Sequence, residues 1–416
     1  MKFHSAAQPI MAPDPTLAHV IPLDGATRID RGPRLDISVY FYTPVCLAGA
    51  LLLAAPVRVL FAAEGLRWAH VLSLAFCLSF SAVPPVAWLA RRFGVLDTPD
   101  GRKPHARPTP LLGGTAVFIG IAVALLTNGV MAPELQAILG AALILFVTGA
   151  CDDWREVPAA VKLAIQVVCT VIVMAAGVVL RVVPEGLGHW AMIGNGLLTL
   201  TWVVGITNAM NFFDGMDGLA AGLGAIIGFF LAAVAYQTDQ PFLGWIALAV
   251  MGACLGFLPF NFRRGQPAGI FLGDAGSTVI GFLLACIAVY GDWAESRPLV
   301  SLASPVLIFW LLIFDMVHTT VDRIATGRVR SVRGWIEYVG RDHLHHRLAD
   351  ALGSARASVM FIYLMGIGLG ISALMLRGAS SEGSLLLLLQ AGILVVLVTV
   401  LERRGRNCSA RRVGDP

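Results

Sequence analysis

The chain has 416 residues, of which 57% are hydrophobic and 13% are charged, and its mean hydropathy is +0.77. Soluble domains carry about 25% charged residues, so this composition excludes a soluble domain. The net charge of +4 requires no nucleic-acid partner, because membrane proteins carry positive charge beside their spans.

The N-terminal residues differ in pattern from everything that follows them. Residues 1–37 contain five prolines, show no sustained hydrophobic period and lack the charged-then-apolar build of a signal peptide. We predict a disordered cytoplasmic tail over 1–37, a polytopic membrane domain over 38–402 and a basic cytoplasmic tail over 403–416.

Long apolar runs fill the membrane domain, and a run of about 20 residues crosses a bilayer as a helix. We therefore predict an all-α integral membrane protein with about 11–12 transmembrane helices and cytoplasmic active-site loops. The runs lie at 39–62, 68–90, 113–131, 135–150, 159–180, 190–207, 219–236, 242–260, 276–291, 299–321, 357–376 and 384–401.

Basic residues are concentrated at alternate junctions between these runs. The rich junctions lie near 91–107, 155–162, 263–264, 323–347 and 403–412. The opposite junctions hold little beyond Arg67, Arg181, Arg297 and Arg377. The positive-inside rule therefore places the rich junctions and both termini in the cytoplasm, as in a multi-pass protein of the inner (plasma) membrane.

The first basic loop contains Lys103 and His105, followed by Pro-Thr-Pro and by Gly113-Gly114. The prolines stiffen the loop, and the glycines permit close approach of a helix or ligand. Lys103 and His105 are candidates for binding phosphate. A basic stop at a helix end, serving orientation alone, explains the same residues.

The second loop contains the adjacent acids Asp152 and Asp153, then Glu156 and Lys162. Neighbouring residues diverge by about 100° on a helix, so the two acids are expected to do different work. Asp153-x-x-Glu156 also fits a capping box for the following helix. A cap does not need Asp152, and paired acids at a membrane mouth suit a general base or a metal-linked carboxylate.

Polar residues recur every three positions at Asn208, Asn211, Asp214 and Asp217. On a helix each step of three drifts by only about 60°, so the first three share a face before Gly215 and the next glycine turn the chain. Amides and carboxylates that converge there suit a hard cation, or a nucleotide whose phosphates carry one. The alternative is a polar loop whose residues cap helices.

A third acidic motif, Gly273-Asp274-Ala-Gly276-Ser277, immediately precedes an apolar run. Asp274 is either the N-cap of that helix or the ligand of a cation, with glycine N–H groups facing an anion.

Three of the nine histidines, His343, His345 and His346, lie just before Arg347. His343 and His345 point to different sides of a helix, and the seven cysteines have no paired spacing, so a zinc site is not indicated. A hydrogen-bonding phosphate or sugar site fits better, with Arg347 as a bidentate partner. A surface cluster without a role is the alternative.

Two other classes of membrane protein were compared with these motifs. A transporter or flippase hides ionisable groups near the bilayer midplane. In this chain only Asp315, His318 and Asp322 are candidates for a position within the membrane, and we expect them to support the active-site loop. A CDP-alcohol phosphotransferase needs a longer pattern in which Ala-Arg follows Asp-Gly, and no Ala-Arg follows Asp214-Gly215 in this chain.

The five motifs taken together, in this order over residues 90–350, resemble the polyprenyl-phosphate N-acetylhexosamine-1-phosphate transferase superfamily. They are most similar to its bacterial branch that begins O-antigen, teichoic-acid and related glycans. The resemblance implies transfer of a sugar 1-phosphate from a UDP-N-acetylhexosamine to undecaprenyl phosphate, with release of UMP. It also implies a requirement for Mg²⁺, with Mn²⁺ as an alternative ion, and is compatible with a homodimer.

The resemblance also implies roles for individual residues. Asp274 and Asn211 resemble the Mg²⁺ ligands, and Asn208, Asp214 and Asp217 the residues at the nucleotide. Asp152 and Asp153 resemble the pair that positions or deprotonates the lipid phosphate. Lys103, His105 and Lys162 would contact phosphates or nucleotide. The diphosphate or sugar would be contacted by His343, His345, His346 and Arg347.

The His-x-His-His form favours a plain UDP-HexNAc, UDP-GlcNAc above all, over UDP-MurNAc-pentapeptide. Three features depart from the family's pattern: Glu156 at the third acidic position, a longer segment at 328–340, and the added apolar run at 39–62.

Overall fold

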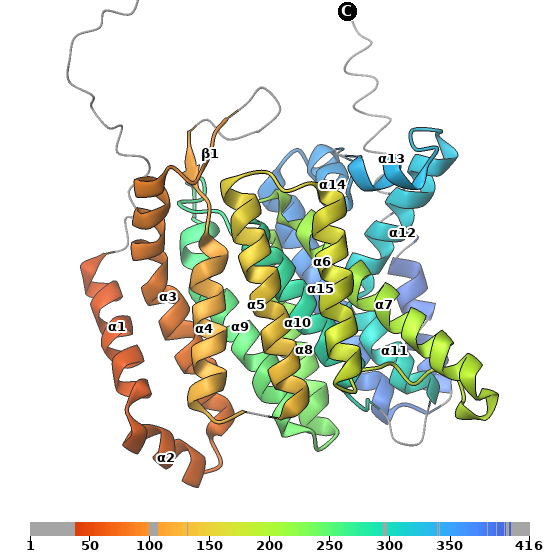
Figure 1. Cartoon of the computed structure of the whole chain (residues 1–416), viewed down its shortest axis with the longest axis horizontal. Helices are drawn as coiled ribbons and strands as arrows, with labels where there is room; N and C mark the ends of the chain where they lie inside the picture. Colours follow the sequence, from red (N-terminus) through yellow and green to blue (C-terminus); the bar gives the residue numbers. More distant parts are fainter. Residues whose placement is uncertain are drawn as a thin grey trace, which may run out of the picture. The chain divides into compact units, whose positions relative to one another are not determined.

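A computed structural model describes residues 38–99, 107–130, 132–293, 298–338, 340, 342–380, 382–387, 389–394, 396 and 399–400. The predicted tails and the candidates Lys103 and His105 lie outside these residues. The helices (Figure 1) are α1 Val39–Leu53, α2 Ala55–Ala63, α3 Arg67–Phe93, α4 Gly113–Thr127, α5 Pro133–Trp154, α6 Ala159–Ala175, α7 His189–Phe212, α8 Leu219–Gln237, α9 Pro241–Asn261, α10 Gly273–Tyr290, α11 Pro298–Ile308, α12 Trp310–Ala325, α13 Val332–Glu337, α14 Leu344–Leu352 and α15 Ala355–Gly378. Two short 3₁₀ turns cover Glu185–Leu187 and Phe213–Gly215, and two two-residue strands, β1 Leu96–Asp97 and β2 Thr109–Pro110, pair antiparallel.

The predicted class, an all-α protein with many membrane spans, is confirmed. In the described part of the chain, seven helices are long and apolar enough to cross a membrane, or eight if a bent pair counts as one span. The predicted number of 11–12 is higher because several apolar runs form helices that are too short by this criterion. These shorter apolar helices are Gly113–Thr127, Ala159–Ala175 and Glu382–Leu394.

Two of the predicted spans are each divided into two helices. The run at 39–62 forms α1 and α2, which meet at 75°. Pro56 has no N–H to donate to the carbonyl of Leu52, and His70 Nε2 bonds that oxygen instead, at 2.9 Å. The run at 299–321 forms α11 and α12, which meet at Phe309.

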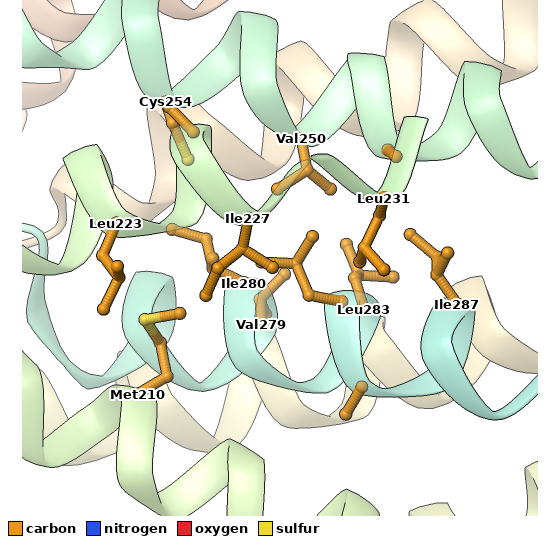
Figure 2. Packing of buried hydrophobic residues seen from close by; sticks show 14 of the residues in the cluster. Met210, Leu223, Ile227, Leu231, Val250, Cys254, Val279, Ile280, Leu283 and Ile287 are labelled. Atoms are coloured by element: carbon orange, nitrogen blue, oxygen red, sulfur yellow. The ribbon is translucent and has the colours of Figure 1, made fainter. Parts of the chain in front are cut away.

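The central helix of the bundle is α10, and 89% of its residues are buried. It packs against α4, α5, α7 and α8. In Figure 2, Val279, Ile280, Leu283 and Ile287 of α10 lie in one apolar layer with residues of the neighbouring helices. Those labelled neighbours are Met210, Leu223, Ile227, Leu231, Val250 and Cys254.

The outer helices expose large apolar side chains instead of burying them. Val147 of α5, Val168 of α6 and Leu197 of α7 are each more than half exposed. Exposed apolar faces of this extent are unfavourable in water, and in a membrane protein they lie against lipid.

Glycines bring two helices unusually close to the start of α10. A Cβ on Gly114 of α4 would lie 2.2 Å from the backbone nitrogen of Gly276, and one on Gly149 of α5 would lie 2.5 Å from Ala275 Cα. The N–H of Gly114 also donates to the carbonyl of Leu272 at 2.7 Å. These contacts place the first turn of α10 directly beside the ends of α4 and α5.

Gly114→Ala is therefore expected to destabilise the protein by about 1–3 kcal/mol, the usual cost of overpacking, because its Cβ meets backbone atoms that cannot rotate away. Gly140→Ala on α5 is the matched control, since a Cβ there meets nothing within 4 Å. Thermal unfolding in detergent micelles measures both. Equal melting temperatures would contradict the close approach of α4 to α10.

Candidate active site

One ammonium group joins two of the predicted acidic motifs. Lys162 Nζ lies 2.8 Å from Asp152 Oδ2 and 2.9 Å from Asp274 Oδ2. Asp152 is at the end of α5, Asp274 at the start of α10 and Lys162 in the first turn of α6, so three helix ends converge. These side chains are 14–28% exposed, so their charges interact more strongly than they would at an open surface.

Asp153 has a different set of partners from its neighbour Asp152. Its Oδ1 accepts the N–H of Asp274 at 2.8 Å, and its Oδ2 accepts the N–H of Ala275 at 3.3 Å. Asp153 thus caps α10 from another helix, where the negative charge also suits the helix dipole. The capping-box alternative is wrong, because α6 begins only at Ala159 and its N-cap is Pro158.

The alternative in which Asp274 caps its own helix is also wrong. The N-cap of α10 is Leu272, and Asp274 is the second helical residue. Gly273, the first, has φ +75°, a left-handed conformation that glycine adopts readily. A Cβ at Gly273 would lie 2.5 Å from Asp153 Oδ2, so glycine is required for the carboxylate to reach the helix start.

The polar residues at the end of α7 turn towards two different helices. Asn208 pairs with Gln166 of α6, its Nδ2 donating to Gln166 Oε1 at 2.5 Å. Asn211 Nδ2 donates to Ser277 Oγ of α10 at 3.0 Å, and its side chain also interacts with the Asp274 carboxylate. The Asp214 carboxylate meets the N–H of Gly273. Asn211 and Asp214 therefore join the acidic cluster, whereas Asn208 ties α7 to α6.

Asp217 lies on the far side of the same turn and supports a loop. Its Oδ2 accepts the N–H of Ala268 at 2.9 Å. Asn261 holds the adjacent backbone, accepting the N–H of Gly218 at 2.7 Å and donating to the carbonyl of Ile270 at 2.9 Å. The chain before α10 is thereby fixed to the turn after α7.

The histidine segment, His343–Arg347, packs against the Asp214–Gly215 turn. A Cβ on Gly215 would lie 2.8 Å from His345 Nε2 and 3.5 Å from His346 Nε2. His343 is the N-cap residue of α14 and stacks on Phe212, with ring centroids 4.8 Å apart. Arg347 lies one turn further along and places Nη1 2.8 Å from His318 Nδ1 of α12. The Gly273–Ser277 motif and the histidine segment thus both contact the Asp214–Gly215 turn.

Two groups beside this turn have shifted pKa values. Burial lowers the pKa of His345 well below its usual value, and the neighbouring charges of His346, His343 and Arg347 lower it further. Burial raises the pKa of Asp342, but the hydrogen bonds and charge of Arg323 more than offset this and bring it below its usual value. A neutral His345 can both accept and donate a hydrogen bond at neutral pH.

The acidic cluster has a donor set that fits Mg²⁺. Among the residues that the structure describes, no three His, Cys, Asp or Glu side chains form a complete metal site. Mg²⁺, however, commonly binds one or two carboxylates and completes its shell with substrate phosphates and water. Asp274 offers a carboxylate, and Asn211 Oδ1 is the amide oxygen that a cation would bind because Nδ2 donates to Ser277.

The structure brings most of the predicted residues together at one end of the bundle, and it adds others. Sequence reasoning missed Gln166, Arg323 and Asp342. Arg323 binds Asp342 through two bonds of 2.7 and 2.8 Å. The sequence could have indicated Asp342, because it directly precedes His343. Nothing in the sequence relates Arg323 to Asp342.

This constellation can hold a charged, phosphate-bearing ligand between a cation-binding carboxylate cluster and a set of histidine and arginine donors. Residues 135–292 match glycosyl transferase family 4. A probable undecaprenyl-phosphate N-acetylglucosaminyl 1-phosphate transferase of Bacillus subtilis is 34% identical over 340 residues, covering 79% of this chain and 90% of that protein.

Two further relatives come from other bacterial groups. A decaprenyl-phosphate N-acetylglucosaminephosphotransferase of Mycobacterium tuberculosis is 35% identical over 69% of this chain and 77% of that protein. An undecaprenyl-phosphate alpha-N-acetylglucosaminyl 1-phosphate transferase of Escherichia coli K12 is 28% identical over 66% of this chain and 75% of that protein. The chain therefore belongs to the polyprenyl-phosphate N-acetylhexosamine-1-phosphate transferase superfamily, and it is a multi-pass membrane protein.

Proposed function

We propose that this protein transfers N-acetylhexosamine 1-phosphate, with GlcNAc as the sugar, from its UDP derivative to undecaprenyl phosphate. An oxygen of the lipid phosphate forms a bond to the β-phosphorus of the donor. The bond from that phosphorus to the bridging oxygen breaks, and UMP leaves. The products are undecaprenyl-diphosphate-GlcNAc and UMP, and the reaction initiates synthesis of a cell-envelope glycan.

The observation that carries this proposal is the Lys162 ammonium shared by Asp152 and Asp274 at the start of α10. Two anionic substrates must meet, so the site has to supply positive charge at the point of contact. Lys162 supplies one such charge. Mg²⁺, held by Asp274 and Asn211, would screen the diphosphate and polarise its phosphorus.

Asp152 is oriented to act on the lipid phosphate. Its Oδ1 accepts the N–H of Val157 at 2.7 Å and its Oδ2 accepts Lys162, so the carboxylate has one orientation. Asp153 acts differently, by holding the first turn of α10 in place. His345, His346 and Arg347 would bind the donor diphosphate or sugar.

We also propose that this end of the bundle faces the cytoplasm, where UDP-sugars are made. Arg91 and Arg92 end α3 immediately before β1, whose partner β2 is bonded through Pro110 to Phe271 just before α10. Basic residues at this end are what the positive-inside rule requires of a cytoplasmic face. Figure 1 places β1, α13 and α14 at the same end.

The test uses membranes containing the protein, undecaprenyl phosphate, Mg²⁺ and a panel of radiolabelled UDP-HexNAc donors. Label from UDP-GlcNAc is expected in the organic phase, with stoichiometric release of UMP. No lipid label from any donor, with folded protein present, would overturn the proposal. A phospho-sugar or UMP trapped on the protein without lipid would replace direct attack by a covalent step.

Removal of divalent cations is expected to reduce this transfer to background, because Asp274 and Asn211 would then be left without the ion that joins them to the donor phosphates. EDTA followed by Mg²⁺ in excess measures the loss and the recovery. Undiminished transfer in EDTA would exclude the cation from the reaction.

A further inference from the structure

A buried carboxylate contacts the first residues of the histidine segment. Asp315 of α12 is 0% exposed. Its Oδ2 bonds His343 Nδ1 at 2.7 Å, and its Oδ1 accepts the N–H of Leu344 at 2.6 Å and the hydroxyl of Thr319 at 3.3 Å. A buried charge is costly unless it is fully bonded, so the carboxylate and the start of α14 depend on each other.

Both ring nitrogens of His343 are occupied by protein groups. Nδ1 lies 2.7 Å from Asp315 Oδ2, and a carboxylate only accepts, so Nδ1 donates. Nε2 lies 3.3 Å from Nη2 of Arg323. His343 is therefore held between two residues of α12.

Arg323 is itself fixed, so it cannot turn away from His343. It pairs with Asp342 at 2.7 and 2.8 Å through two nitrogens, and its guanidinium lies 4.4 Å from the ring centroid of Tyr338. Tyr338 belongs to the segment at 328–340. That segment thus contacts the arginine that lies against His343.

His345, two residues further on, has the opposite character. It is 0% exposed, and neither ring nitrogen has a hydrogen-bond partner among the residues that the structure describes. Its ring packs between Phe213 at 5.5 Å and His343 at 6.1 Å, with Nε2 towards Gly215. Buried polar atoms nearly always have partners, so these nitrogens are suited to a ligand at the Asp214–Gly215 turn.

We propose that Asp315 is a positioning residue for the donor. Through His343 and the Leu344 N–H it fixes the start of α14, and it thereby presents His345 to the diphosphate of the UDP-sugar. Asp315 does not touch the substrate. This inference rests on the proposed function, since it assumes that the donor binds at the Asp214–Gly215 turn.

Asp315→Asn tests the proposal, because the new amide must direct its NH₂ at one of two N–H donors and lose that bond. The KM for UDP-GlcNAc is expected to rise by about 10-fold or more, the effect of losing one hydrogen bond to a charged group. The KM for undecaprenyl phosphate should be unchanged. Asp350→Asn is the matched control, the same substitution at an exposed acid on α14.

A merely structural role would lower the melting temperature and the active fraction but leave the donor KM of the folded enzyme unaltered, and that result would overturn the proposal. If Asp315→Asn fails to fold, His343→Asn removes the same link from its other end. A wild-type donor KM in His343→Asn would then overturn the proposal.

Nitrogen-15 NMR of histidine-labelled protein separates this inference from the proposed function. The ring signals of His343, assigned by their loss in His343→Asn, should change in Asp315→Asn but not in Asp350→Asn. No lipid label with any donor would overturn the proposed function. An unchanged His343 signal in Asp315→Asn would overturn the positioning role whether or not the wild-type protein is active.

Discussion

Replacing Asp274 by Asn is expected to reduce transfer of the phospho-sugar by about 10²–10³-fold, the usual cost of removing one preorganised electrostatic group. Asn has nearly the same size, so the start of α10 should persist. Its neutral amide cannot neutralise Lys162, which lies 2.9 Å from the carboxylate, and it would attract Mg²⁺ less strongly than a carboxylate does. Asp274 is also the only acid that contacts both Lys162 and Asn211 among the described residues.

The measurement is label from UDP-GlcNAc entering the organic phase, normalised to folded protein. Asp350→Asn is the matched control, because Asp350 is an exposed acid on α14 beside the histidine segment. Asp350→Asn should keep activity close to that of the wild type. Activity of Asp274→Asn within a few-fold of the control would contradict the assignment of Asp274 to the reaction centre.

Gly273→Ala is expected to reduce activity by about 100-fold, because a small displacement of a catalytic group has effects of that size. The new Cβ would lie 2.5 Å from Asp153 Oδ2, so the carboxylate that caps α10 must move. The backbone N–H groups of Asp274 and Ala275 then lose the Asp153 carboxylate as their acceptor. The carboxylate of Asp274 would be displaced from Lys162 as a consequence.

Backbone strain has to be separated from this displacement, and the chain offers a suitable control. Gly265 also has a left-handed φ of +70°, but a Cβ there meets nothing within 4 Å. Both variants should lose about 1–2 kcal/mol of stability through left-handed strain. Only Gly273→Ala should lose activity per folded molecule. Equal activity in the two variants would show that the Asp153 cap does not control the site.

The partners of Asp153 illustrate how neighbouring acids acquire different surroundings. Asp152 and Asp153 are adjacent, and their divergence on α5 gives them different partners. Which acid faces Lys162, and which caps α10, depends on how α5 packs beside α10. That packing brings Gly149 of α5 against Ala275 of α10.

Composition and hydrophobic period were sufficient to predict the class of protein, because a helix satisfies all of its backbone hydrogen bonds within one segment in lipid. They were not sufficient to predict the number of spans. Pro56 and His70 bend one apolar run, and Phe309 marks the break in another, so length in sequence overstated length in helix.

Motif order was sufficient to predict the family and most of the residues that the structure brings together, since each motif lies at the end of an apolar run. Only the tertiary structure decided how the residues divide their work. His343 and His345 are two positions apart, yet α12 supplies partners to the first and none to the second. The spacing of side chains along a helix determines which way they point. Their hydrogen-bond partners, however, come from helices 28 to 121 residues away, and helix packing determines which partners those are.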